Sequence, residues 1–150
     1  ELFIIPSSSM QPTLQIGDRI LVKKTDNYQP QQGDLVVFFA PEAAKKNDLF
    51  VQENKEVIYI KRIIGQPRQT VQVRQGVIYL DGQPLSEDYA VTPPNYEVTS
   101  LVLSEQMYWV LGDNRNESFD SHIWGSLPAK NIIGQAYKII FPPQRVRSLL

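Results

Sequence analysis

The sequence contains no cysteine and a single histidine, His122. Disulfide bridges and thiol nucleophiles are therefore excluded, and a structural zinc site cannot be assembled from its usual sulfur and nitrogen ligands. Metal catalysis through carboxylates is left as a weak alternative, and we expect no metal site. The absence of cysteine does not identify a cellular compartment, since an exported protein needs no cysteine.

An excess of charge of one sign and long hydrophobic runs are also missing. The 150 residues include 15 Lys and Arg and 16 Asp and Glu, which gives a formal net charge of −1. This balance sets aside nucleic-acid binders, which ordinarily show a basic excess. No apolar run approaches the roughly 20 residues of a membrane-spanning helix. Since the chain begins at Glu1, directly before the apolar group Leu2 to Ile5, we expect that a preceding segment is absent from it.

Alanine, the best helix former, is scarce, with 6 Ala against 13 Val and 14 Ile. β-Branched residues favour pleated sheets, and no stretch of ten residues sustains the helical apolar period. Only Pro128 to Asn131 suggests a helical turn. Strands are predicted near Asp18 to Lys23, Asp34 to Phe39, Val57 to Ile64, Thr70 to Arg74, Val77 to Leu80, Glu97 to Leu103, Met107 to Leu111 and Ile132 to Phe141. Glycine and aspartate turns between them predict an all-β fold built on an antiparallel sheet.

The length fits one compact domain with a small lobe. We expect residues 1–65 and 107–150 to form the β core, and residues 66–106, which contain four prolines, to form a small inserted β lobe. Residues 42–56 carry many charges and are predicted to be an exposed loop.

Three hydroxyl groups, those of Ser7, Ser8 and Ser9, lie between Pro6 and Pro12. Prolines stiffen the backbone, so this loop could hold a nucleophile still. The alternative is an ordinary polar turn that leads into the first strand.

The predicted strand that contains Lys61 places this lysine in an apolar setting. Because side chains alternate along a strand, Lys61 shares a face with Val57, Tyr59 and Ile63. One interpretation is an edge strand that uses Lys61 and Arg62 to block unwanted pairing. The other is a buried lysine that acts as a base, which requires its pKa to fall from about 10.4 towards roughly 8.

A polar, turn-rich block runs from Gly112 to Gly125 and contains His122. Ser118, Asp120 and His122 suggest a Ser-His-Asp triad, but in an extended strand they would be spaced roughly 6.5 Å apart along one line and could not converge. The alternative is a loop whose side chains satisfy backbone groups, among them Asp113, Asn114, Arg115 and Asp120.

These blocks, taken in order, closely resemble the sequence boxes of type I signal peptidases. Ser9 to Leu14 resembles the nucleophile box, Gly33 to Phe38 a second box and Tyr59 to Arg62 the base box. Gly112 to Arg115, continued to Asp120-Ser121, resembles the last box. His122 departs from the arginine common there in bacterial members, and Asp-Ser-His followed by Trp-Gly resembles the cyanobacterial and thylakoid-type branch.

The resemblance implies a serine endopeptidase with a Ser–Lys dyad and no cofactor or metal. Ser9 corresponds to the nucleophile and a neutral Lys61 to the general base, while Ser118 is expected to hydrogen-bond the Lys61 amine. The Ser9 N–H and the Ser7 hydroxyl are expected to form the oxyanion hole. The expected supports of this geometry are Arg62, Asp113, Arg115 and Asp120.

The resemblance also implies the substrate and the location. The expected substrates are preproteins that carry a signal peptide, cut after an Ala-X-Ala-like site, with no nucleic acid involved. An N-terminal anchor, absent from this chain, would hold the catalytic domain on the periplasmic or thylakoid-lumen side of a membrane, with Phe3, Ile4 and Phe39 dipping into lipid. Two alternatives stay open: a self-cleaving Ser–Lys domain of the repressor-processing kind, and a catalytically silent β binding module.

Overall fold

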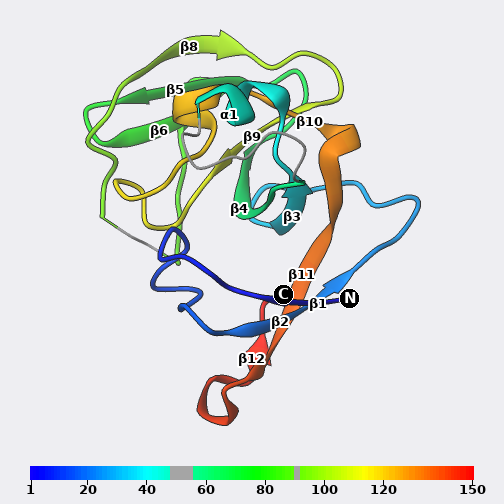
Figure 1. The fold of residues 1–150 in the computed structure, drawn as a ribbon. Coiled ribbons are helices and arrows are strands. Elements are labelled where there is room, and N and C mark those ends of the chain that lie inside the picture. The colour runs from blue at the N-terminus through cyan, green and yellow to red at the C-terminus, as the bar shows by residue number, and fades with distance from the viewer. Residues whose placement is uncertain (48–55, 90–91) are drawn as a thin grey trace.

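The computed structural model describes residues 1–47, 56–89 and 92–150, which form two antiparallel β-sheets (Figure 1). Within these residues the larger sheet has eight strands, in the order β1 (Leu2–Ile4), β2 (Arg19–Lys23), β11 (Ile132–Phe141), β3 (Leu35–Phe39), β4 (Ile58–Gly65), β9 (Met107–Leu111) and β10 (Leu127–Pro128), with β12 (Arg147–Ser148) beside β11. The second sheet has four described strands, β7 (Gln83–Pro84), β6 (Val77–Leu80), β5 (Thr70–Arg74) and β8 (Val98–Val102). The predicted all-β, antiparallel fold is confirmed.

Burial along each strand explains why these sequences are extended. β2 and β5 alternate between buried and more exposed positions, as expected for strands with one face on the core. β3 is buried at four consecutive positions because both of its faces are covered: Leu35 and Val37 pack in one apolar cluster, and Val36 and Phe38 pack in another. Figure 1 shows β5, β6 and β8 together at one end of the molecule and β1, β2 and β12 at the other.

The buried apolar residues form three clusters. One lies under β1, β2 and β11 and includes Met10, which follows Ser9 directly, and Leu14, one turn further along the same loop. The second surrounds Phe38 and Trp124. The third joins the second sheet to β9 through Trp109 and Leu111. The serine loop, residues 6–14, and the second sheet are thus each attached to the core by packing.

Two short helices differ from the sequence expectation. α1 (Glu42–Asn47) begins in the segment predicted to be an exposed loop, and its Ala44 is fully buried in the cluster around Trp124. α2 (Ser121–Trp124) lies in the predicted turn-rich block, with Asp120 as its N-cap. The helical turn expected near Pro128 is the 3₁₀ turn η1 (Ala129–Asn131). Residues 48–55 of the predicted loop lie outside the described residues.

The helices of the described chain are short. None of them has the length and apolar character that crossing a membrane requires.

Candidate active site

Ser9 and Lys61 lie 52 residues apart in the sequence and meet in the fold. Lys61 Nζ donates a hydrogen bond of 2.7 Å to Ser9 Oγ, and the two residues are only 4% and 8% exposed. Lys61 is on β4 and pairs with Val36 of β3, but its side chain is buried in the protein and not exposed to solvent. The interpretation of Lys61 as an exposed guard of an edge strand is therefore wrong.

The surroundings of Lys61 disfavour its charged form. Burial lowers the pKa of the Lys61 ammonium from 10.5 to about 8, although the carboxylates of Asp120 and Asp113 act in the opposite direction. The ring of Tyr59 lies 5.8 Å from Nζ. A substantial fraction of this amine is thus neutral in weakly alkaline solution, and a neutral amine can accept the proton of the hydroxyl it contacts.

The loop that carries Ser9 is held by its own backbone and by the core. Gln11 N–H donates to Ser8 O at 3.0 Å and Leu14 N–H donates to Met10 O at 3.0 Å. Met10 and Leu14 are fully buried. The Ser7 hydroxyl lies 3.3 Å from Ser9 Oγ, so two of the three serine hydroxyls face the same point.

A second turn, Gly112 to Arg115, lies against this loop and is hydrogen-bonded to it. Asn114 N–H donates to Ser9 O at 3.0 Å, and the Asn114 side-chain amide donates to Ser8 O at 3.1 Å. A Cβ at Gly112 would lie 2.5 Å from Ser9 O and would also overlap Ser118. Only glycine therefore lets the two chain segments approach this closely.

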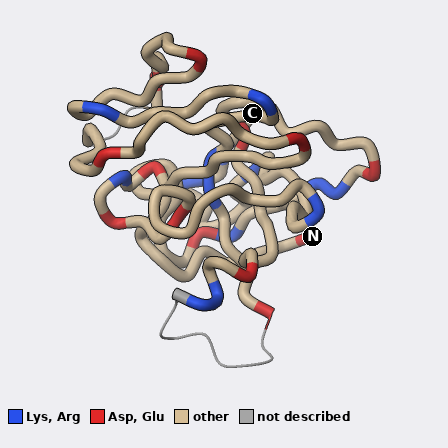
Figure 2. Tube along the Cα trace, turned by 90° about the horizontal axis from the view of Figure 1, so that it is seen from above, with Lys and Arg blue, Asp and Glu red and all other residues tan. Residues whose placement is uncertain are grey.

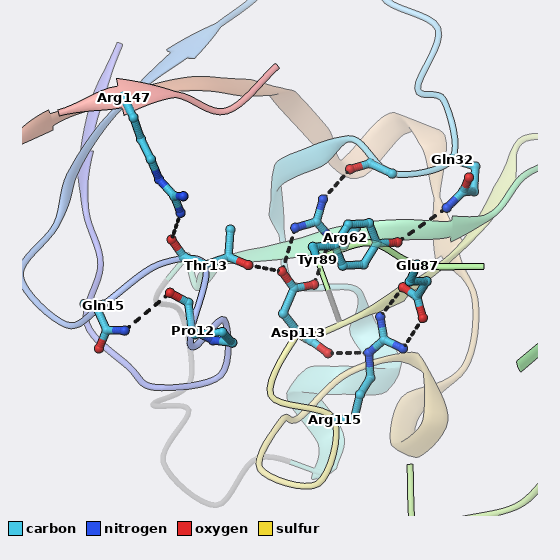
Figure 3. Close-up of polar contacts among 12 residues, drawn as sticks. Pro12, Thr13, Gln15, Gln32, Arg62, Glu87, Tyr89, Asp113, Arg115 and Arg147 are labelled. Atoms are coloured by element: carbon cyan, nitrogen blue, oxygen red, sulfur yellow. Dashed lines mark hydrogen bonds and ion pairs between the residues drawn. The ribbon is translucent and has the colours of Figure 1, made fainter. Parts of the chain in front are cut away.

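Asp113 is the centre of a buried ion pair. Arg62 donates to its two carboxylate oxygens at 2.8 and 2.6 Å, and Thr13 Oγ1 donates to it at 2.5 Å (Figure 3). Arg62 follows Lys61 on β4, and Thr13 belongs to the serine loop. Asp113 thus joins the two elements that bring Lys61 and Ser9 together.

Asp120 organises the backbone next to this turn. Its side chain is fully buried and accepts hydrogen bonds from Gly112 N–H at 2.9 Å and His122 N–H at 3.1 Å, and it contacts His122 Nδ1 at 2.5 Å. The α2 turn produces this Asp–His pair, which an extended strand could not form. In the loop predicted to satisfy backbone groups, Asn114, Arg115 and Asp120 do so, whereas the carboxylate of Asp113 accepts from the side chains of Arg62 and Thr13.

Ser118 differs from both sequence expectations. Its Oγ is buried and has no hydrogen-bond partner among the described residues. It therefore donates neither to Lys61, as the resemblance implied, nor to His122, as a triad requires. The Ser-His-Asp triad is wrong because its nucleophile and its base are not joined.

An open cleft borders the Ser9–Lys61 pair. A cavity of about 150 Å³ is lined by Ser7, Ser9 and Lys61 and otherwise mainly by apolar side chains of β1, β3 and β4. The first half of β4, Ile58–Lys61, pairs with β3, whereas its pairing with β9 begins at Arg62. Within the described chain, the outer side of Ile58–Lys61 has no neighbouring strand.

Sequence reasoning missed three residues that cover the back of this site. Glu87 forms a bidentate ion pair with Arg115, and Arg62 stacks over the ring of Tyr89 at 3.6 Å. Tyr96 stacks on His122 with ring centroids 3.7 Å apart. All three come from the region between β7 and β8, where no sequence pattern marked them.

Comparison with known proteins identifies the class of enzyme. Residues 1–141 match the family described as signal peptidase, peptidase S26. A probable signal peptidase I of Synechocystis is 45% identical over 143 residues, which cover 94% of this chain and 71% of that protein. A probable thylakoidal processing peptidase of Arabidopsis thaliana is 37% identical, over 97% of this chain and 39% of that protein.

The fold agrees with these matches. The crystal structure of a signal peptidase I from Enterococcus faecalis superposes with a TM-score of 0.55 and 27% sequence identity, covering 76% of this chain and 98% of that chain. The protein is therefore an enzyme of the serine endopeptidase class. It belongs to the signal peptidase family S26, and its relatives include cyanobacterial and thylakoidal members.

Proposed function

We propose that the protein removes signal peptides from exported preproteins with Ser9 as nucleophile and Lys61 as general base. The observation that carries this proposal is the 2.7 Å contact between a buried Lys61 amine and the Ser9 hydroxyl. A lysine can take the place of a histidine base when burial lowers its pKa, and here burial lowers the pKa of Lys61 to about 8.

In this mechanism neutral Lys61 accepts the Ser9 proton while Oγ attacks the scissile carbonyl carbon. The carbonyl oxygen becomes an oxyanion, which the Ser9 N–H and the Ser7 hydroxyl stabilise. Lys61 then delivers the proton to the leaving amine, and the acyl group stays on Ser9 until water hydrolyses it. Asp113, Arg62, Arg115 and Asp120 hold the two segments in register, with no cofactor taking part.

The cleft supports an extended substrate with small apolar side chains. The open side of Ile58–Lys61 can pair with a peptide backbone as an added strand. The cavity of about 150 Å³ beside it has room for small side chains at alternate positions. We therefore propose cleavage after an Ala-X-Ala-like sequence.

We further propose that the enzyme works against a lipid surface, anchored in the membrane, on the periplasmic or lumenal side. Ile4 and Ile58 line the cavity, and they are 59% and 40% exposed. Phe39 is 37% exposed and is the cross-strand neighbour of Ile58. Phe3 was expected to enter the lipid together with Ile4 and Phe39. It is half-buried against the core and does not belong to this exposed set.

The test is cleavage of a peptide that contains an Ala-X-Ala junction, with product masses to locate the cut. We expect cleavage after the second alanine by the wild type, none by Ser9→Ala or Lys61→Ala, and persistent cleavage by His122→Ala. Ser7→Ala removes one oxyanion donor and should lower kcat about 10²- to 10³-fold. Ser100→Ala and Lys138→Ala, at exposed positions remote in sequence from these boxes, are the matched controls.

Each alternative makes a different prediction in this assay. An active Lys61→Ala together with an inactive His122→Ala would overturn the Ser–Lys mechanism. A self-cleaving domain would cut its own chain and leave the added peptide intact. A binding module would bind the peptide without cutting it.

A further inference from the structure

Residues between β7 and β8 contact Arg62 and Arg115, the two arginines that support the Ser9–Lys61 site. The supporting segment, residues 85–89, starts at Leu85, whose N–H donates to Ile78 O of β6 at 2.8 Å. Leu85 also packs against the buried cluster that joins the second sheet to β9. The second sheet therefore fixes where this segment lies.

Glu87 reaches Arg115 from this segment. Arg115 Nη1 and Nη2 donate to the two Glu87 carboxylate oxygens at 2.7 and 2.5 Å, and Arg115 Nε donates to Gly112 O at 3.0 Å. The Arg115 side chain is 2% exposed and that of Glu87 is 12% exposed. Removal of the Glu87 carboxylate would leave this guanidinium buried without its ion partner, which is strongly unfavourable and favours a shift of the Arg115 side chain.

The turn held by Arg115 is the one that touches the serine loop. Asn114, the preceding residue, donates to Ser8 O and Ser9 O. Gly112, whose carbonyl Arg115 binds, lies against Ser9 O. A shift of Arg115 is therefore transmitted to the carbonyl groups of the residues that present the Ser9 hydroxyl.

Tyr89 acts on the second arginine. The Arg62 guanidinium lies over its ring, with Cζ 3.6 Å from the ring centroid, and Gln32 donates to the Tyr89 hydroxyl at 3.5 Å (Figure 3). Arg62 is 6% exposed. The ring shields the Arg62–Asp113 ion pair from water and restricts the guanidinium to one orientation.

We propose that Glu87 and Tyr89 are positioning residues for the peptidase reaction, through which the second sheet fixes the Ser9 loop against Lys61. Neither residue touches the reacting atoms. Each acts through one arginine, Glu87 on the Gly112–Arg115 turn and Tyr89 on the Arg62–Asp113 pair. This inference rests on the proposed function for its kinetic consequence, but its structural consequence can be measured without any turnover.

The kinetic test compares Glu87→Gln and Tyr89→Ala with two matched controls. Glu105→Gln removes the carboxylate of an exposed ion pair to Arg68, and Tyr79→Ala removes the ring beside Arg74. We expect kcat for the Ala-X-Ala peptide to fall about 10- to 100-fold in the two test variants, as for a displaced catalytic group. KM should change by no more than about twofold. Tyr89→Phe keeps the ring and should retain most of the activity.

The structural test is amide hydrogen exchange of the same variants. The Asn114 amide, bound to Ser9 O, and the Leu14 amide, bound to Met10 O, should exchange faster in Glu87→Gln and Tyr89→Ala than in either control. Amides in the centre of β3 should be unchanged. If Glu87→Gln does not fold, Glu87→Asp, which only shortens the side chain, carries the test.

The outcomes separate this inference from the proposed function. Unchanged exchange at Asn114 with kcat equal to that of the controls would overturn the positioning role. A uniform rise that includes β3 would also overturn it, because it would reveal general destabilisation. A third outcome combines two results: the wild type cuts no peptide, but the amides of Asn114 and Leu14 exchange faster in the two test variants while those of β3 do not. This outcome would support the positioning role and refute the proposed function.

Discussion

Lys61 is the residue whose protonation links stability and activity most directly. Burial lowers its pKa from 10.5 to about 8 in the folded protein, so the unfolded chain binds this proton more tightly. At a pH below about 8, Lys61 is protonated in the folded protein as well, and the buried ammonium makes the folded state less stable. We expect the free energy of unfolding to rise with pH between about 8 and 10.5, by about 3 kcal/mol at 1.36 kcal/mol per pKa unit.

The measurement is denaturant unfolding of wild type and Lys61→Met across this pH range. All other ionisable groups are the same in both proteins, so the difference between the two isolates Lys61. We expect Lys61→Met to be the more stable near neutral pH and its advantage to shrink as the pH rises. A constant difference would mean that the Lys61 pKa is not lowered by folding.

Gly112 gives a second prediction at this scale. A Cβ there would overlap Ser118 and lie 2.5 Å from Ser9 O, so either Ser118 or the serine loop must move. We expect Gly112→Ala to destabilise the fold by about 1–3 kcal/mol, as overpacking does, and to lower kcat about 100-fold. Unfolding and peptide cleavage measure the two effects.

Ser118→Gly distinguishes where the strain falls. In Gly112→Ala/Ser118→Gly the clash with Ser118 is gone but the approach to Ser9 O persists. The double variant should be nearly as stable as Ser118→Gly alone, because the clash with Ser118 is absent. Its activity should stay well below that of Ser118→Gly, because the Cβ at position 112 still lies against Ser9 O. Full activity in Gly112→Ala would show that the close approach of the two segments is dispensable.

At the scale of elements, η2 (Pro143–Arg145) and β12 together form a C-terminal hook that contacts the serine loop at Thr13. Arg145 donates to both oxygens of the buried Asp18 at 2.7 Å, and Arg147 donates to Thr13 O at 2.7 Å. Burial raises the pKa of Asp18, but the hydrogen bonds from Arg145 and Gln15 outweigh it and hold this pKa below its usual value.

Arg145→Gln tests the hook. It leaves the Asp18 carboxylate buried without its ion partner, and we expect a loss of about 2–3 kcal/mol near neutral pH. A lowered carboxyl pKa contributes stability above the unfolded pKa of about 3.9 that is lost as the pH falls further. The difference between wild type and variant should therefore shrink in acid.

Lys24→Gln is the control, because it breaks the exposed pair of Lys24 with Glu1 and should change stability far less than Arg145→Gln does. If the deficit of Arg145→Gln matches that of Lys24→Gln, or stays constant down to low pH, the Arg145–Asp18 pair does not stabilise the hook.

The sequence predicts those elements that depend on local residues and misses those that depend on contacts between distant segments. Strands such as β2 and β4 follow from their β-branched residues and from the turn residues nearby, and the four boxes point to Ser9 and Lys61. α1 was missed because a six-residue helix with two lysines owes its position to the burial of Ala44 beside Trp124, a contact between distant segments. The Glu87–Arg115 pair spans 28 residues, and no local pattern contains it.

At the scale of the whole molecule, the two signs of charge are interspersed over the described chain rather than gathered on one face (Figure 2). Together with the net charge of −1, this distribution gives no electrostatic reason to bind an anionic surface. The proposed attraction to a lipid surface must then come from exposed apolar side chains such as Ile4, Ile58 and Phe39.

Liposome co-sedimentation tests this property of the whole molecule. We expect the protein to bind neutral vesicles and to stay bound at roughly 0.5 M salt, where charge interactions are screened within a few Å. Ile4→Gln and Phe39→Gln should each weaken binding, since burying a side chain of this size contributes about 1.5–3 kcal/mol. Val102→Gln, at a position 67% exposed on the second sheet, should bind like the wild type. Binding that disappears in salt, or that weakens equally in Val102→Gln, would show that the apolar rim of the cleft is not the surface that meets the lipid.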